Sequence, residues 1–173
     1  MTLVLKRTAL FIFIVLLWVL VAAAIARAAT RDIVNMPGFA PGTIVVKTQE
    51  RRLYYVLDGM RALRFPVGVG KAGQRWSGVT TVDAKYVRPA WAPPDDIRQE
   101  NPRLPEVIPG GAPNNPMGVA ALTLRGLDYA IHGTNNPASI GRFVSHGCIR
   151  MHNRDIRELF QLVQVGTPVI VER

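Results

Sequence analysis

Short strand-forming segments separated by turn residues dominate the chain after residue 41, and they constrain its fold more than any other feature. Thr43–Lys47 is rich in β-branched residues and follows two Pro-Gly dipeptides. Arg52–Leu57 and Ala62–Val67 flank Asp58-Gly59, which predicts a hairpin with a two-residue turn. Further strands are expected over Val79–Val87, Val119–Leu124, Leu127–His132 and Thr167–Glu172. These segments predict a mainly β domain.

One helix is expected, close to the C-terminus. Asn153 is of a type that favours helix N-caps, so a helix is predicted over Arg154–Val165, ending before Gly166. Its apolar residues recur at helical spacing and are Ile156, Leu159, Phe160 and Val163. Residues 89–116 are instead rich in proline and lack periodicity, which predicts a long ordered loop. The expected architecture is a single strand-rich domain with one short helix.

Residues 1–28 have the features of an export signal. Lys6 and Arg7 precede the uncharged run Thr8–Ala26, and Ala26-Arg27-Ala28 has the small-x-small pattern of a signal peptidase site. The alternative is a retained membrane anchor, because the run approaches the ~20 residues that span a bilayer. Either interpretation carries the rest of the chain across the membrane. We therefore expect a signal peptide or anchor over 1–28, a linker over 29–41 and one domain over 42–173.

The charge balance narrows the choice of partners. Lys and Arg number 21 against 12 Asp and Glu, a net charge of +9, which raises nucleic acid as a partner. The basic residues are scattered and form no basic helix face, and an exported protein seldom meets nucleic acid. We therefore expect no nucleic-acid binding, and attribute the charge to solubility and mild attraction to anionic envelope polymers. No feature indicates oligomerisation, so a monomer is expected.

The residues best able to do nucleophilic or acid–base chemistry lie together in residues 131–153. This stretch holds Cys148, the single cysteine, and all three histidines. A lone cysteine in an exported protein is either an inert core residue or a working thiol. Gly147 before it allows a tight turn, with the amides of Gly147 and Cys148 as candidate oxyanion donors. His132 ends an apolar strand before a glycine and could reach a cleft as the base. The combination favours a nucleophilic cysteine over a buried thiol with locally satisfied histidines.

A zinc site and a serine nucleophile are less well supported by this stretch than a cysteine nucleophile. His132, His146, Cys148 and His152 could form a zinc ligand set, but the His146-Gly-Cys148 spacing is tight, no carboxylate is placed near the cluster as a general base and HExxH is absent. Ser145 is not surrounded by GxSxG, as a serine nucleophile of that type would be. We therefore expect no metal and no cofactor.

The motifs of this region resemble those of a known family. Ile131-His-Gly-Thr134, followed by Ser145-His-Gly-Cys-Ile-Arg-Met-His-Asn153, closely resembles the catalytic signature of the L,D-transpeptidase (YkuD-type) family, whose members act on bacterial peptidoglycan. Asn115-Pro-Met-Gly118 resembles the family's Asn-Pro-Leu-Gly element. The resemblance covers about residues 42–171 and implies an L,D-transpeptidase-like β sandwich or barrel. Ser77-Gly-Val-Thr80 departs from the Thr-Pro-Thr-Gly turn that is common in the family.

The resemblance implies a cysteine acyltransferase and a role for each catalytic residue. Cys148 would attack the carbonyl between the third residue and the terminal D-alanine of a tetrapeptide stem. His132 would be the base, with its ring held by the Gly133 carbonyl. The amides of His146, Gly147 and Cys148 would stabilise the oxyanion.

The resemblance also implies substrate contacts and partners. Arg150 would bind a substrate carboxylate or form a structural ion pair, Ser145 would shape the site, and Trp91 would line the donor groove or simply pack under its loop. The partners would be peptidoglycan stem peptides in the periplasm or cell envelope, and carbapenems would acylate Cys148. The acceptor could be a second stem, water, a free D-amino acid or a lipoprotein lysine. A wall-binding domain with an inert thiol is the remaining alternative.

Overall fold

The protein is described here by a computed structural model that covers residues 32–173; the expected signal peptide or anchor lies outside these residues. The strands are β1 (Ile33–Asn35), β2 (Ile44–Lys47), β3 (Arg52–Val56), β4 (Arg61–Gly70), β5 (Gly78–Val87), β6 (Ala120–Leu124), β7 (Ala130–His132), β8 (Phe143–Ser145), β9 (Ile149–Met151) and β10 (Pro168–Glu172). The helices are α2 (Asp95–Glu100), the short 3-10 helix η1 (Pro137–Ser139) and α3 (Asn153–Leu162). Among the described residues, no helix has the length and apolar character to cross a membrane.

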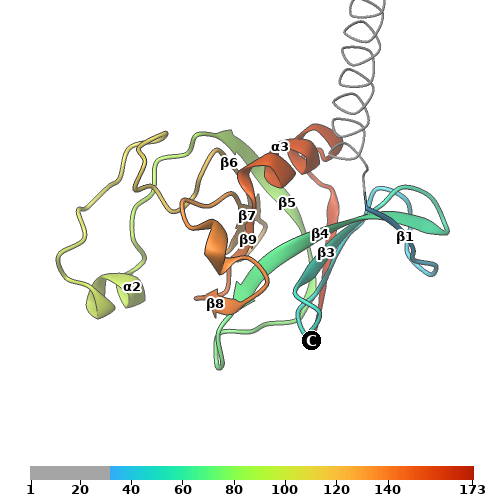
Figure 1. The fold of residues 1–173 in the computed structure, drawn as a ribbon, viewed down its shortest axis with the longest axis horizontal. Helices are drawn as coiled ribbons and strands as arrows, with labels where there is room; N and C mark the ends of the chain where they lie inside the picture. Colours follow the sequence, from blue (N-terminus) through green and yellow to red (C-terminus); the bar gives the residue numbers. More distant parts are fainter. Residues whose placement is uncertain (1–31) are drawn as a thin grey trace, which may run out of the picture. The chain divides into compact units, whose positions relative to one another are not determined.

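The sheet closes on itself through the long strand β4. The strand order is β1-β4-β3-β2-β10-β5-β6-β7-β9, and β9 pairs with β4 as well as with β7. In Figure 1, β4 runs from beside β1 to beside β8, so different parts of it meet different neighbours. Its first part pairs with β1 and β3, and its end pairs with β9 and β8. The result is a closed β barrel, which confirms the expected mainly β class.

The alternating faces of the strands fill two cores. In β2, Ile44 and Val46 face the main core, while Val45 faces a second one, as the two-residue period of a strand requires. The main core also receives Ile156 and Leu159 of α3, both fully buried, which confirms the predicted helical face. At about 25 cal/mol per Å² of apolar surface, this burial is the main driving force for the fold.

Residues 33–41, expected as part of a linker, instead belong to the fold. Strand β1 pairs antiparallel with β4. Met36 is 5% exposed in the second core, and its amide donates to the Met60 carbonyl at 2.7 Å. The three strand residues of β1 are too few to show a periodicity that the sequence could reveal.

Other local expectations need correction. The first hairpin is longer than a two-residue turn: the Asp58 carboxylate accepts from the Met60 and Arg61 amides at 2.9 and 2.8 Å, which holds a wider turn. The loop over 89–116 contains α2, whose six residues lack an apolar face. The N-cap of α3 is His152, and Asn153 lies inside the helix, where its side chain makes tertiary hydrogen bonds instead of a cap.

Candidate active site

A three-residue turn over His146–Cys148, here called the HGC turn, presents the cysteine. It connects β8 to β9, and both strands pair with β4, so the turn is anchored at each end. Ser145 closes it: its Oγ donates to the Cys148 carbonyl at 2.6 Å and accepts the Gly147 amide at 3.2 Å. The sulfur of Cys148 is therefore carried by a rigid turn on a closed sheet.

Gly147 is required by its backbone conformation and by its neighbours. Its φ is +126°, a region that L side chains rarely adopt. A Cβ here would lie 2.2 Å from the ring of Tyr129, which stacks on Trp76 with ring centroids 5.7 Å apart. The Gly147 carbonyl accepts from Trp76 Nε1 at 2.9 Å. Because the Gly147 amide already donates to Ser145, the amides of His146 and Cys148 remain as candidate oxyanion donors.

Strand pairing places His132 beside the HGC turn. Strands β7 and β9 run parallel, with His132 opposite Arg150, so Ala130 lies opposite Cys148. His132 is 4% exposed, and its Nδ1 lies 2.6 Å from the Gly133 carbonyl. A carbonyl can only accept, so this contact assigns the proton to Nδ1 and leaves Nε2 with its lone pair. The contact with the Gly133 carbonyl thus orients the ring and assigns its tautomer.

The surroundings keep both reactive groups neutral. Burial, helped by the Arg150 charge, lowers the pKa of His132 from 6.5 to about 4, although hydrogen bonds to the Gly133 and Pro116 carbonyls oppose the change. Burial also raises the pKa of the Cys148 thiol, against the Ala130 amide and the Arg150 charge. At neutral pH the pair is therefore a thiol and an uncharged imidazole.

These groups share a pocket of about 430 Å³. Six of the predicted site residues line it: Trp91, His132, Ser145, His146, Cys148 and Arg150. Gly133 and Gly147, the other two, support the site through their backbone. The sequence prediction therefore converges in space on a single cavity.

Arg150 and Trp91 occupy different parts of this pocket. The Nε atom of Arg150 is buried without a hydrogen-bond partner, and no carboxylate within residues 32–173 forms an ion pair with its guanidinium. Trp91 pairs through its backbone with Ile108, with N···O distances of 2.9 and 2.8 Å, while its half-buried side chain faces the pocket. A positive charge and an aromatic ring are thus both available to a bound molecule.

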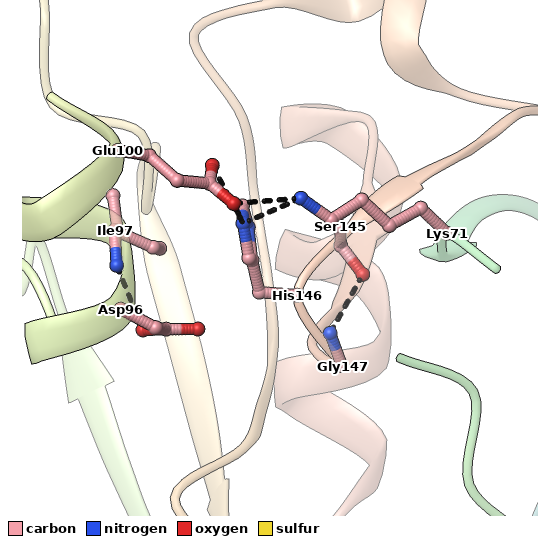
Figure 2. A network of polar contacts seen from close by, with 7 residues as sticks. All are labelled: Lys71, Asp96, Ile97, Glu100, Ser145, His146 and Gly147. Atoms are coloured by element: carbon pink, nitrogen blue, oxygen red, sulfur yellow. Dashed lines mark hydrogen bonds and ion pairs between the residues drawn. The ribbon is translucent and has the colours of Figure 1, made fainter. Parts of the chain in front are cut away.

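Several pocket residues were missed by the sequence reasoning. Asp96 and Ile97 of α2 line the cavity, and Glu100 at the end of α2 contacts His146, so a carboxylate does lie near the cluster in space (Figure 2). Glu100 is separated from His146 by 46 positions, and α2 has no periodicity to mark it. In the described part of the chain, no three His, Cys, Asp or Glu side chains are grouped as metal ligands.

Asn153 holds the segment that follows His132. Its Oδ1 accepts from the amides of Thr134 and Val119 at 3.0 and 3.3 Å, and its Nδ2 donates to the Thr134 carbonyl at 3.0 Å. A Cβ at Gly133 or Gly118 would come within 2.3 Å of Oδ1, so both positions need glycine. One amide side chain thereby joins α3 to the base of the pocket.

Replacing Asn153 with alanine should lower the free energy of unfolding by about 2–4 kcal/mol, because two amides lose their acceptor and each unsatisfied buried group costs ~1–3 kcal/mol. Urea denaturation measures the loss. Asn153→Asp is the matched control, since it keeps the acceptor oxygen and should cost less. Equal stability of the alanine variant and the unmodified protein would contradict this role.

Comparison with known proteins identifies the class that this barrel and pocket define. Residues 41–171 match the model of the YkuD family, the L,D-transpeptidase catalytic domain. The chain belongs to the L,D-transpeptidase family.

Curated relatives agree with this assignment, and a solved structure shares the fold. The chain is 45% identical over 133 residues to a probable L,D-transpeptidase, ErfK/SrfK, of Escherichia coli strain K12, covering 73% of this chain and 42% of the relative. It is 35% identical over 134 residues to a putative L,D-transpeptidase, YqjB, of Bacillus subtilis strain 168, covering 74% and 69%. An L,D-transpeptidase structure from Mycobacterium smegmatis superposes with a TM-score of 0.61 at 22% identity, covering 76% and 58% of the two chains. The chain thus spans about two-fifths of the length of the Escherichia coli relative.

Proposed function

We propose that this protein is an exported cysteine acyltransferase that acts on the tetrapeptide stems of peptidoglycan. The observation that carries the proposal is the shared pocket of Cys148 and His132, in which the Gly133 carbonyl holds the imidazole at 2.6 Å with Nε2 free to accept a proton. A lone cysteine on a rigid turn beside such a base has the arrangement of a nucleophile and its general base.

The first half-reaction forms a thioester. The Cys148 sulfur attacks the carbonyl between the third residue and the terminal D-alanine, and its proton passes to Nε2 of His132. Because both groups start neutral, the proton moves as the carbon–sulfur bond forms. The amides of His146 and Cys148 stabilise the oxyanion, and one such donor can be worth ~3 kcal/mol. The carbon–nitrogen bond then breaks, and His132 returns the proton to the departing D-alanine amine.

The second half-reaction transfers the acyl group. An acceptor amine attacks the thioester while His132 takes its proton, and the sulfur leaves and recovers that proton. With the third residue of a second stem as acceptor, the product is a 3-3 cross-link. Water, a free D-amino acid or a lipoprotein lysine would enter by the same chemistry.

The pocket supplies groups suited to a peptide stem. Arg150, which has no ion-pair partner in residues 32–173, binds a stem carboxylate. Trp91 forms part of the donor groove, and Ser145 keeps the HGC turn in shape. The protein acts in the periplasm or cell envelope as a monomer on stem peptides, with no nucleic-acid partner. Residues 1–28 serve as a cleaved signal or as an anchor.

Intact-protein mass spectrometry of the full chain with a disaccharide-tetrapeptide tests the proposal. We expect a transient adduct equal to the donor minus D-alanine, and a product mass that identifies the acceptor. The protein mass itself shows whether residues 1–28 are removed. A folded protein that leaves the donor intact and forms no adduct would refute this activity.

Carbapenems offer an orthogonal probe of the same thiol. Solved relatives include an L,D-transpeptidase in complex with imipenem and the Enterococcus faecium catalytic domain acylated by ertapenem. We expect ertapenem to acylate Cys148 here, which peptide mapping would locate.

A further inference from the structure

A capping segment, residues 88–118, forms one wall of the pocket and is fixed at its base. Trp91 pairs with Ile108 across the segment, and Asn115 Nδ2 donates to the carbonyls of Pro89 and Pro109 at 2.9 and 3.0 Å. Its far end is different: none of the residues of α2 is buried. No fully buried side chain of α2 therefore holds the helix in place; Ile97 is only half-buried, and it lines the pocket together with Asp96.

A three-residue polar contact joins this far end to the barrel. His146 Nε2 lies 3.0 Å from each Glu100 carboxylate oxygen, and Lys71 Nζ lies 3.0 Å from Glu100 Oε1 and 2.9 Å from His146 Nε2. Figure 2 shows these side chains converging from three parts of the chain. Within residues 32–173, every hydrogen bond and ion pair from α2 to the barrel passes through Glu100.

The contact persists whichever proton state His146 adopts. An unprotonated Nε2 accepts from Lys71, and a protonated one donates to Glu100. In both states Lys71 still bridges to Glu100. The hydrogen bond from His146, present when Nε2 carries a proton, and the hydrogen bond from Lys71 lower the pKa of the Glu100 carboxyl below its usual value. The Glu100 side chain is 56% exposed, so the contact is weak and screened by salt, and it can open and reform.

We propose that Glu100 is a positioning residue for the transferase: through His146 and Lys71 it holds the α2 wall over the HGC turn, and so sets how tightly the stem peptide binds. The inference rests on the proposed function for its substrate, but the contact itself can be tested without one. Because Glu100 does not line the pocket, it acts on binding through the wall and leaves the chemistry at Cys148 unchanged.

Steady-state kinetics of the full chain with a tetrapeptide donor at low salt provide the test. Glu100→Gln, which keeps the shape and removes the charge, should raise KM roughly twofold to fivefold and change kcat less, as expected for loss of an exposed ionic contact. The reversed pair Lys71→Glu with Glu100→Lys should restore KM, whereas Glu100→Lys alone should raise it further. Glu106→Gln, an exposed carboxylate in the same segment, is the matched control and should behave as the unmodified enzyme.

Hydrogen exchange of the α2 amides separates this inference from the proposed function. Faster exchange in Glu100→Gln, reversed in the double variant, supports the positioning role even if the protein transfers no acyl group. Unchanged exchange, or an unchanged KM in an active enzyme, would overturn it. A failure of the double variant to recover would show that pairing of the two charges is not what holds the wall.

Discussion

Cys148→Ala is expected to abolish acyl transfer, with a rate loss of about 10⁴-fold or more, because the thioester cannot form without the sulfur. Cys148→Ser should be nearly as inactive. A hydroxyl holds its proton far more tightly than a thiol, and a histidine whose pKa is about 4 is too weak a base to remove it. Release of D-alanine from a tetrapeptide, together with the intact mass, measures both variants.

The fold should survive both changes. Cys148 is half-buried, and neither its carbonyl contact with Ser145 nor the pairing of β9 with β4 requires the sulfur. Thermal unfolding within a few degrees of the unmodified protein is therefore the control. Turnover by a folded Cys148→Ala protein at more than about one-hundredth of the normal rate would rule out the cysteine as the nucleophile.

His132→Gln should lower kcat/KM by roughly 10²–10⁴-fold, the contribution of a positioned general base.

The unmodified enzyme should keep its activity down to unusually acidic pH, because His132 must be neutral and its pKa is about 4. The acidic limb of the kcat/KM profile should therefore fall near pH 4 and not near 6.5. An acidic limb near 6.5 would contradict the lowered pKa of His132, whereas an unchanged kcat/KM in a folded His132→Gln protein would show that His132 is not the base.

The same histidine should make stability depend on pH. The unfolded chain protonates this side chain below about pH 6.5, whereas the folded protein protonates it only below about 4, so the unfolded state binds more protons between these values. The free energy of unfolding should therefore fall by about 3 kcal/mol as pH drops from 6.5 to 4. His132→Gln should remove this share of the pH dependence, and His152→Gln, outside the pocket, should retain it. Parallel pH profiles for all three proteins would contradict the effect of burial.

Local patterns were sufficient for most of the fold. The period of two in β2 and the helical spacing of Ile156 and Leu159 show which face each element buries. A strand that packs on a core buries every second residue, and a helix buries every third or fourth. Of the four strands with three residues, β7 was predicted and β1, β8 and β9 were not. Strands β8 and β9 have three residues each, and they form because β4 is long enough to pair with both after its pairing with β3.

The amino-acid sequence by itself determined the family, because a single stretch of chain contains one cysteine, a histidine before a glycine and the His-Gly-Cys motif. The same residues suggested the chemistry that we propose. Only the tertiary structure decided what surrounds them. Burial, with the charge of Arg150, lowers the pKa of His132. The Asn153 side chain accepts hydrogen bonds from the Thr134 and Val119 amides instead of capping the helix. Helix α2 brings Glu100 into contact with His146. The physical reason is that electrostatic and hydrogen-bond energies depend on distance in space, and residues 46 positions apart share no local pattern that records their contact.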